Sequence, residues 1–335
     1  MPPDELLHPT PQGLYCPPGD FYVDPVRPVG KAVITHGHAD HARAGHGAVL
    51  ATPETLAIMA VRYGEDFTGQ RQALAYGEGV TINGVDVCLV PAGHVLGSAQ
   101  AVITHRGTRI VVSGDYKRRP DPTCLPFEPV PCEVFVTEAT FGLPVFRHPD
   151  DGVEIARLLE SLRLFPERTH LVGAYALGKA QRVIALLRRA GWERPIWLHG
   201  AMEALCETYR EQGVELGELK PARDAGPLPG EIVVAPPSAI AERWSRRFAD
   251  PVTAACSGWM RVRARARQAR AELPLVISDH ADWGELLRTL DDVLAPEVWV
   301  THGSEEALVH AAGQRGYRAR ALALIGRGEA EQEAG

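Results

Sequence analysis

Short apolar runs alternate with segments of helical periodicity along most of the chain, which is typical of an α/β protein. In the first 140 or so residues the runs predict strands, and each strand ends at a polar cluster. These strands cover residues 29–35, 85–90, 101–104, 109–113 and 133–137. From about residue 151, helical patterns at 151–165, 178–190, 201–212 and 238–248 alternate with strand runs at 170–175, 195–199, 231–235 and 252–255. This second part predicts a parallel sheet with crossover helices on its faces.

The pattern of the first part returns near the end of the chain. After about residue 273, the strand runs LVISDH, VWVTHG and ARALALIG appear, with helical patterns at 282–291 and 304–313. We therefore predict one discontinuous domain, residues 1–145 and 271–335, with a second domain, residues 146–270, inserted into it. A length of 335 residues suits two domains of ordinary size.

Composition places the chain among globular proteins, since 45% of its residues are hydrophobic and 23% are charged. No apolar run is long enough to span a membrane, and the opening MPPDELLHPTPQG lacks the features of a signal peptide. The six cysteines are scattered and show no C-x-x-C spacing, which argues against a disulfide framework or a thiolate zinc site. We expect a cytoplasmic protein with no membrane partner.

Charge is unevenly distributed. The net charge is −7, yet residues 242–270 hold eight arginines against Glu242 and Asp250. Within that stretch, arginines occupy alternate positions from 261 to 267. As a strand, this run would place its arginines on one face, where they could follow a phosphate backbone; as a helix, it would spread them over a solvated surface. The sequence leaves both interpretations open.

The strongest local motif lies where the strand at 29–35 ends. There the string Thr35-His-Gly-His-Ala-Asp-His41 brings together His36, His38, Asp40 and His41. Two histidines two residues apart in an extended turn can face one metal, and the next two side chains can reach a second. Imidazole nitrogen and carboxylate oxygen suit zinc, and also manganese or iron.

Two metals need further ligands, and candidates follow other strands. His94 lies in PAGHVLGS, Asp115 in SGDYK and His302 in VTHG, each just after an apolar run. Side chains at such strand ends can meet at one rim of a sheet, and Asp115 has two oxygens with which to bridge two cations. We predict a site for two divalent ions, with zinc favoured and manganese as the alternative.

These motifs together resemble a known superfamily. H-x-H-x-D-H followed by a lone His and a lone Asp resembles the metallo-β-lactamase fold, an αββα sandwich with a two-metal site at one edge. Glu138 in VTEATFG, His280 in ISDHAD and His302 resemble the three extra motifs of the β-CASP nucleases, and residues 173–183, GAYALGKAQRV, are similar to a β-CASP segment. The resemblance covers essentially the whole chain, and GLYCPPGDFYVDP followed by THGHADHAR is most similar to the bacterial ligase-associated DNA exonuclease group.

The resemblance implies a role for each matched residue. Metal one would be held by His36, His38 and His94, metal two by Asp40, His41 and His302, and Asp115 would bridge them. His280 would contact the scissile phosphate or protonate the leaving oxygen, and Glu138 would orient its imidazole. Asp24 would support the histidine cluster. The catalytic set is thus Asp40, Asp115, Glu138 and His280, and the substrate-binding candidates are Lys179, Ser257, Arg261 and Arg263.

The function that follows is a two-metal phosphodiesterase that acts as a DNA exonuclease on single strands in the 5′ to 3′ direction. The resemblance places it in DNA repair, with an ATP-dependent DNA ligase and a helicase as functional partners. A β-CASP ribonuclease of RNA processing or decay is the main alternative. A small-molecule thioester or lactam hydrolase shares the metal pair but gives no reason for the inserted domain, and a metal-free scaffold gives no reason for a full set of ligands.

Overall fold

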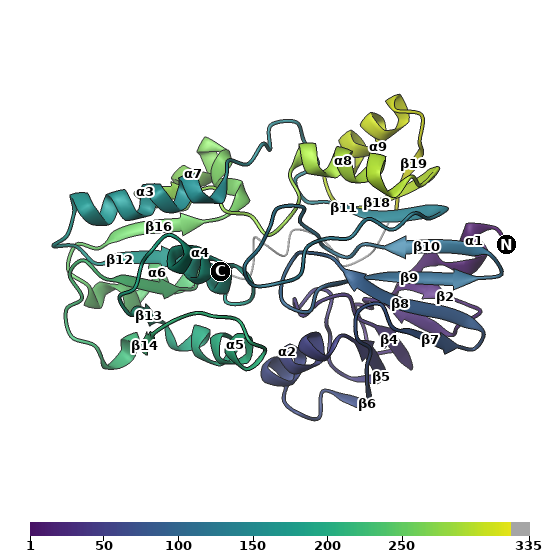
Figure 1. Ribbon diagram of the computed structural model, residues 1–335, viewed down its shortest axis with the longest axis horizontal. Coiled ribbons are helices and arrows are strands. Elements are labelled where there is room, and N and C mark those ends of the chain that lie inside the picture. The colour runs from purple at the N-terminus through teal and green to yellow at the C-terminus, as the bar shows by residue number, and fades with distance from the viewer. Residues whose placement is uncertain (323–335) are drawn as a thin grey trace. The chain divides into compact units, whose positions relative to one another are not determined.

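The computed structural model describes residues 1–322, and its chain divides into two compact units (Figure 1). Within the described residues, unit 1 comprises Met1–Pro144 and 280–322, and unit 2 comprises Val145–Asp279. The second boundary falls after Asp279 and not after Arg270. The reason is that β17 (Leu273–Leu275) pairs with β16 (Val252–Cys256) and so extends the sheet of unit 2.

Unit 1 contains two sheets. The first has the order β1-β2-β3-β4-β5-β6 and the second the order β19-β18-β11-β10-β9-β8-β7. The strands of the first sheet are β1 (His8–Thr10), β2 (Gly13–Cys16), β3 (Phe21–Val23), β4 (Lys31–Val33), β5 (His46–Ala51) and β6 (Thr68–Ala73). Those of the second are β7 (Gly79–Ile82), β8 (Val85–Pro91), β9 (Ala99–His105), β10 (Thr108–Val112), β11 (Val134–Ala139), β18 (Glu297–Gly303) and β19 (Arg318–Ala321).

Successive side chains of the second sheet point to opposite faces and pack into two separate hydrophobic cores. Ile110 and Val112 pack with residues of the first sheet, whereas Val111 between them packs with helices on the opposite face. Those helices are α8 (Trp283–Val293) and α9 (Glu305–Gln314), and α2 (Pro53–Tyr63) packs on the outer face of the first sheet. Figure 1 shows α8 and α9 beside β11 and β18. The layers are helix, sheet, sheet and helix, so the expected αββα sandwich is confirmed.

Unit 2 is built on one sheet whose strands all run parallel. Its order is β14-β13-β15-β12-β16-β17, and the strands not yet given are β12 (His170–Gly173), β13 (Ile196–Leu198), β14 (Leu219–Pro221) and β15 (Ile232–Ala235). The accompanying helices are α3 (Asp151–Leu164), α4 (Lys179–Arg189), α5 (Gly200–Glu211), α6 (Pro237–Ala241) and α7 (Arg263–Gln268). The predicted alternation of parallel strands and helices in this unit is confirmed. A four-residue helix, α1 (Pro3–Leu6), opens the chain in unit 1.

Several local predictions were wrong in detail. No single helix covers 238–248, because Glu242 is extended, with ψ −175°, and separates α6 from a short 3₁₀ turn. The strand expected over LVISDH stops at Leu275, and the last four residues of ARALALIG lie outside the described part of the chain. Strands β5 and β6 were missed because they contain Gly47 and Gly69. A Cβ at these glycines would approach a neighbouring backbone oxygen to 2.6 and 2.7 Å, so close strand contact selects glycine there and weakens the strand pattern.

The alternating arginines are helical. Residues 263–268 form α7, which excludes the strand interpretation. By helical geometry, Arg263 and Arg267 share one side while Arg265 points to the other, where its guanidinium lies 5.5 Å from the centre of the Trp259 ring. In the described part of the chain, none of the helices is long and apolar enough to cross a membrane.

Candidate metal centre

The histidine motif follows β4 as a loop that is held by one buried aspartate. Asp24, fully buried at the end of β3, accepts hydrogen bonds from Thr35 N at 2.7 Å and Thr35 Oγ1 at 2.6 Å. Its second oxygen also lies 2.8 Å from Nδ1 of His41. A carboxylate on Nδ1 fixes the tautomer and orientation of an imidazole and leaves Nε2 to face a metal. Asp24 therefore contacts both the loop and one imidazole of the histidine motif.

Three loops from different strands bring the first ligand group together. His36 and His38 follow β4, His94 follows β8, and Asp115 follows β10. One donor atom of each of these four residues lies within 4.8 Å of the others. Oδ2 of Asp115 lies 3.5 Å from Nε2 of His36 and 3.7 Å from Nε2 of His94. This is a compact, mostly buried set of three nitrogens and one oxygen.

The second ligand group shares Asp115. Nε2 of His41 lies 3.5 Å from Oδ2 of Asp115 and 3.6 Å from Oδ2 of Asp40. The ring of His302 stacks on that of His41, with centres 5.3 Å apart and planes inclined by 22°. Because the same Asp115 oxygen faces histidines of both groups, it occupies the position of a bridge.

A β-bulge aims His302 at this group. Along the parallel pair β11–β18, Glu138 lies opposite Thr301 and Ala139 opposite Gly303, so the register shifts by one residue at His302. His302 itself has a φ of 61°, in the left-handed region. Bulges redirect a side chain in this way and are common beside active sites. Sequence reasoning found His302 from its place after a strand but had no signal for the bulge.

The donor set fits divalent cations. Nε2 of His36 and Nε2 of His41 are buried and form no hydrogen bond within residues 1–322. Burial, together with the neighbouring imidazoles, lowers the pKa of His36 well below its usual value, so this side chain is neutral and able to coordinate. Burial also raises the pKa of Asp115 to about 7. Burial alone would lower the pKa of His41, but the carboxylates of Asp115, Asp40 and Asp24 raise it to about 9. A cation would replace these protons.

Glu138 and His280 form a separate pair next to the ligands. Both are buried, at 1% and 6% exposed, and Oε2 of Glu138 lies 2.9 Å from Nδ1 of His280. The other oxygen of Glu138 accepts a hydrogen bond of 2.8 Å from Tyr116 N, which locks the carboxylate in place. The His280 ring packs against that of His94, with centres 4.6 Å apart. Donor atoms of Asp115, Glu138 and His280 also lie within 4.8 Å of one another.

The substrate-binding candidates lie in unit 2 and differ in exposure. Arg261 and Arg263 are exposed, whereas Ser257 uses its hydroxyl to cap the following turn, accepting a 3.2 Å bond from Trp259 N. Lys179 is only 1% exposed, and its ammonium lies 3.2 Å from Oδ2 of Asp279. Direct contact with a phosphate requires an accessible ammonium. That of Lys179 is buried and already pairs with a carboxylate inside unit 2.

The structure also shows supporting residues that sequence reasoning missed. Thr35 links the two carboxylate oxygens of Asp24, and the Tyr116 backbone positions Glu138. Lys117, fully buried, pairs with Asp121 and donates to the carbonyl of His94 at 3.4 Å. Two of these, Tyr116 and Lys117, directly follow the ligand in SGDYK, but the sequence gives no sign of their long-range partners.

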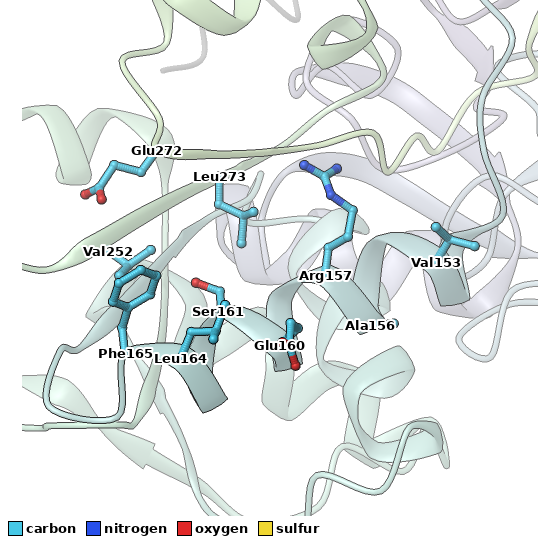
Figure 2. A pocket seen from close by; sticks show the side chains of 10 residues that line it. All are labelled: Val153, Ala156, Arg157, Glu160, Ser161, Leu164, Phe165, Val252, Glu272 and Leu273. Carbon is cyan, nitrogen blue, oxygen red and sulfur yellow. The ribbon is translucent and has the colours of Figure 1, made fainter.

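Unit 2 also has an apolar surface pocket of about 720 Å³, shown in Figure 2. It lies between α3 and the strands β16 and β17, and Leu164, Phe165, Val252 and Leu273 line it. The charged side chains of Arg157, Glu160 and Glu272 also line it. None of the residues that line it belongs to the metal ligands or to the Glu138–His280 pair.

Comparison with known proteins gives partial matches. No family model matches the chain. A protein named "Probable DNA ligase" from Opitutus terrae is 27% identical over 318 residues, which cover 92% of this chain and 30% of that protein. "Endoribonuclease ysh1" of Aspergillus fumigatus is 34% identical over 112 residues, covering 32% of this chain and 13% of that protein. The chain thus spans less than a third of the length of either relative.

A solved structure supports the architecture. A protein of unknown function from Enterococcus faecalis V583 matches with a TM-score of 0.57 at 14% identity, over 83% of this chain and 76% of that one. At this identity, the likeness concerns the fold alone. The αββα sandwich, the second unit built on a parallel sheet, the converging ligand motifs and these relatives together support a metallo-β-lactamase fold with a β-CASP unit for this chain.

Proposed function

We propose that this protein is a metal-dependent nuclease that acts as a DNA exonuclease. The observation that carries the proposal is the convergence of two ligand groups on Asp115, with the Glu138–His280 pair beside them. Two divalent cations held there would supply positive charge to a phosphodiester and make water acidic enough to attack it at neutral pH. Zinc is the favoured ion because imidazoles dominate the ligands, and manganese is the alternative.

The candidate ligands would then fall into two sets, one for each cation. His36, His38 and His94 would hold one cation, Asp40, His41 and His302 the other, and Asp115 both. Asp24 keeps the imidazole of His41 in the orientation that coordination requires.

The Glu138–His280 pair would handle the leaving group. The Glu138 carboxylate accepts from Nδ1 of His280 and favours the protonated imidazole. Nε2 would then give its proton to the leaving oxygen as the P–O bond breaks, a role that typically contributes about 10²- to 10⁴-fold to a rate. Exposed arginines at 261 and 263 would bind phosphates of the strand, with Ser257 as a further candidate. Lys179, which the sequence also suggested, is buried and pairs with Asp279, so it is not part of that surface.

The choice of DNA rests on the relative named "Probable DNA ligase", whose match extends over 92% of this chain. We propose repair of DNA beside a ligase, with attack on single strands in the 5′ to 3′ direction and with a helicase as a second functional partner. We also propose a cytoplasmic location. All six cysteines lie in the described part of the chain and take part in no disulfide there, and disulfides are rare in cytosolic proteins.

Ribonuclease activity is the second candidate. It is favoured by the match to a protein named as an endoribonuclease, at 34% identity over 112 residues. Both candidates use the same metal centre, and the difference between them lies in the surface that binds the strand.

A single digestion experiment separates the candidates. DNA and RNA strands of the same sequence, each labelled at one end and then at the other, are incubated with the metal-loaded protein and a panel of divalent ions. Stepwise release of nucleotides from the 5′ end of DNA would support the proposal. Cleavage of RNA with DNA left intact would select the ribonuclease, and hydrolysis of a lactam or thioester with both strands intact would reject both nucleases.

A salt titration tests the strand-binding residues. Replacing Arg261 and Arg263 with alanine should weaken DNA binding and reduce the slope of log affinity against log salt by about one for each phosphate that the variant no longer neutralises. Replacing Arg243 and Arg246 with alanine provides a control that removes the same charge from the same unit. Equal slopes in both variants would assign Arg261 and Arg263 to an ordinary solvated surface.

A further inference from the structure

A buried cluster of four charged side chains in unit 2 is not used by the chemistry described above. Asp151 begins α3, Lys179 and Arg182 lie in the first turn of α4, and Asp279 ends the unit. Arg182 is completely buried, and none of the other three is more than 8% exposed. The cluster contains two cations and two carboxylates, so it is neutral as a whole.

Asp279 is held by both cations. Its Oδ1 lies 3.3 Å from Nη1 of Arg182, and its Oδ2 lies 3.2 Å from Nζ of Lys179. The second terminal nitrogen of Arg182 pairs with Asp151, which ties α4 to α3. The planar guanidinium therefore bridges two carboxylates in a fixed geometry that an ammonium could not reproduce.

The cluster also fixes the backbone before Asp279. Nη1 of Arg182 donates to the carbonyl of Ser278, and the Glu154 carboxylate accepts a 2.8 Å bond from Val276 N. Side chains of α3 and α4 thus hold the segment 276–279, which has no strand or helix of its own. The next residue in the chain is His280.

Residues on the other side of His280 are held as well, within unit 1. Ala281 N donates to the Tyr116 carbonyl at 2.7 Å, and the Asp282 carboxylate lies 2.9 Å from Nη2 of Arg119. The N–H of Tyr116 in turn donates to Glu138. Side chains thus hold the backbone of Ser278 and Asp279 within unit 2, and other contacts hold that of Ala281 and Asp282 within unit 1.

A buried ion cluster is a poor means of adding stability, because the desolvation of four charges offsets much of their attraction. It is a good means of selecting one geometry, since a shifted guanidinium would leave buried carboxylates unpaired. A displacement of about 1 Å in a catalytic group can cost about 100-fold in rate.

We propose that Arg182, supported by Asp151, Lys179 and Asp279, is a positioning residue that sets the place of the His280 imidazole through the backbone of Ser278 and Asp279. The proposal rests on the proposed nuclease function and adds to it a determinant that acts along the chain through the two residues before His280.

A double-mutant cycle tests this role. Arg182→Met should lower kcat on an oligonucleotide about 10- to 100-fold, with metal content and KM close to wild type. In a His280→Ala background the same substitution should change the residual rate less than twofold, because a positioning residue has no effect once the group it positions is gone. Asp151→Asn, which keeps the shape of the carboxyl group, should give a smaller loss in the same direction and covers the case in which Arg182→Met does not fold.

Arg188→Met is the matched control. Arg188 lies on the same helix and also donates to backbone carbonyls, those of Leu216 at 3.0 Å and Trp192 at 2.7 Å. Its replacement should lower the melting temperature and leave kcat unchanged.

Three results would overturn the proposal. They are an Arg182→Met or Asp151→Asn protein with wild-type kcat, a fall in kcat that is equally large with and without His280, and a fall matched by loss of metal. If the wild-type protein itself cleaves no nucleic acid, the proposed function fails. If the wild type cleaves and His280→Ala is impaired while Arg182→Met is not, this inference alone fails.

Discussion

Replacing Glu138 with glutamine removes one negative charge from the site and little else. Glutamine has the same shape. In the wild type, Oε1 of Glu138 accepts from Tyr116 N at 2.8 Å and lies 3.1 Å from Nδ1 of His280, and Oε2 lies 2.9 Å from the same Nδ1. The glutamine oxygen can occupy one of these two positions. The other position would present an amide NH₂ group, which cannot accept a proton. Nδ1 of His280 then loses one of its two carboxylate oxygens and faces a neutral amide in place of a negative charge.

The magnitude follows from these hydrogen bonds. A hydrogen bond between a charged and a polar group contributes about 1.5–3 kcal/mol, and both partners are buried here, at 1% and 6% exposed. If that energy stabilises the protonated imidazole during proton transfer, its removal lowers kcat by about 10- to 100-fold, since about 1.4 kcal/mol corresponds to a factor of ten. KM and metal content should stay close to those of the wild type.

Single-turnover cleavage of an end-labelled oligonucleotide, with metal measured on the same samples, provides the assay. Glu297→Gln is a matched control, because Glu297 accepts from the Trp299 indole at 2.6 Å at the start of β18, the opposite end of that strand from His302. The reasoning is refuted if Glu138→Gln cleaves at the wild-type rate. A loss of activity in proportion to a loss of metal would instead make Glu138 a ligand, in the alternative group it forms with Asp115 and His280.

Three further predictions concern the metal centre. Asp24→Asn should weaken metal binding about 10- to 100-fold, because it removes the negative charge of the carboxylate that contacts Nδ1 of His41. Competition with a chelator would measure the affinity, and an unchanged affinity would deny Asp24 its supporting role. Gly303→Ala should lower the free energy of unfolding by at least about 1–3 kcal/mol, because φ is 78° and the new Cβ would lie 2.2 Å from the Ala139 oxygen; an unchanged denaturation midpoint would contradict this. Asp115, with a pKa raised to about 7, holds its proton at pH 6 and has released it by pH 8, whereas His41, at about 9, is protonated at both. Calorimetric zinc titrations should thus release about one more proton per chain at pH 6 than at pH 8, and equal release would reject the assignment.

The sequence by itself indicated much of the candidate metal centre. The ligands are types that coordinate divalent ions, and each follows an apolar strand, so His36, His94 and Asp115 could be placed at a common rim without knowing the path of the chain between them. The parallel sheet of unit 2 followed from periodicity, because alternation and helical repeats are local properties of the chain. The αββα layers were expected only from the resemblance of the ligand motifs to the metallo-β-lactamase fold.

Only the tertiary structure decided how these parts are held. The bulge that turns His302 toward His41 depends on the register between β11 and β18, and the burial of Lys179 depends on Asp279, one hundred residues further along the chain. The same is true of Arg182, whose partners lie on both sides of it in the sequence. Neither strand register nor the pairing of buried charges is encoded in any short segment. Each is fixed only when distant segments pack and every buried polar group must find a partner.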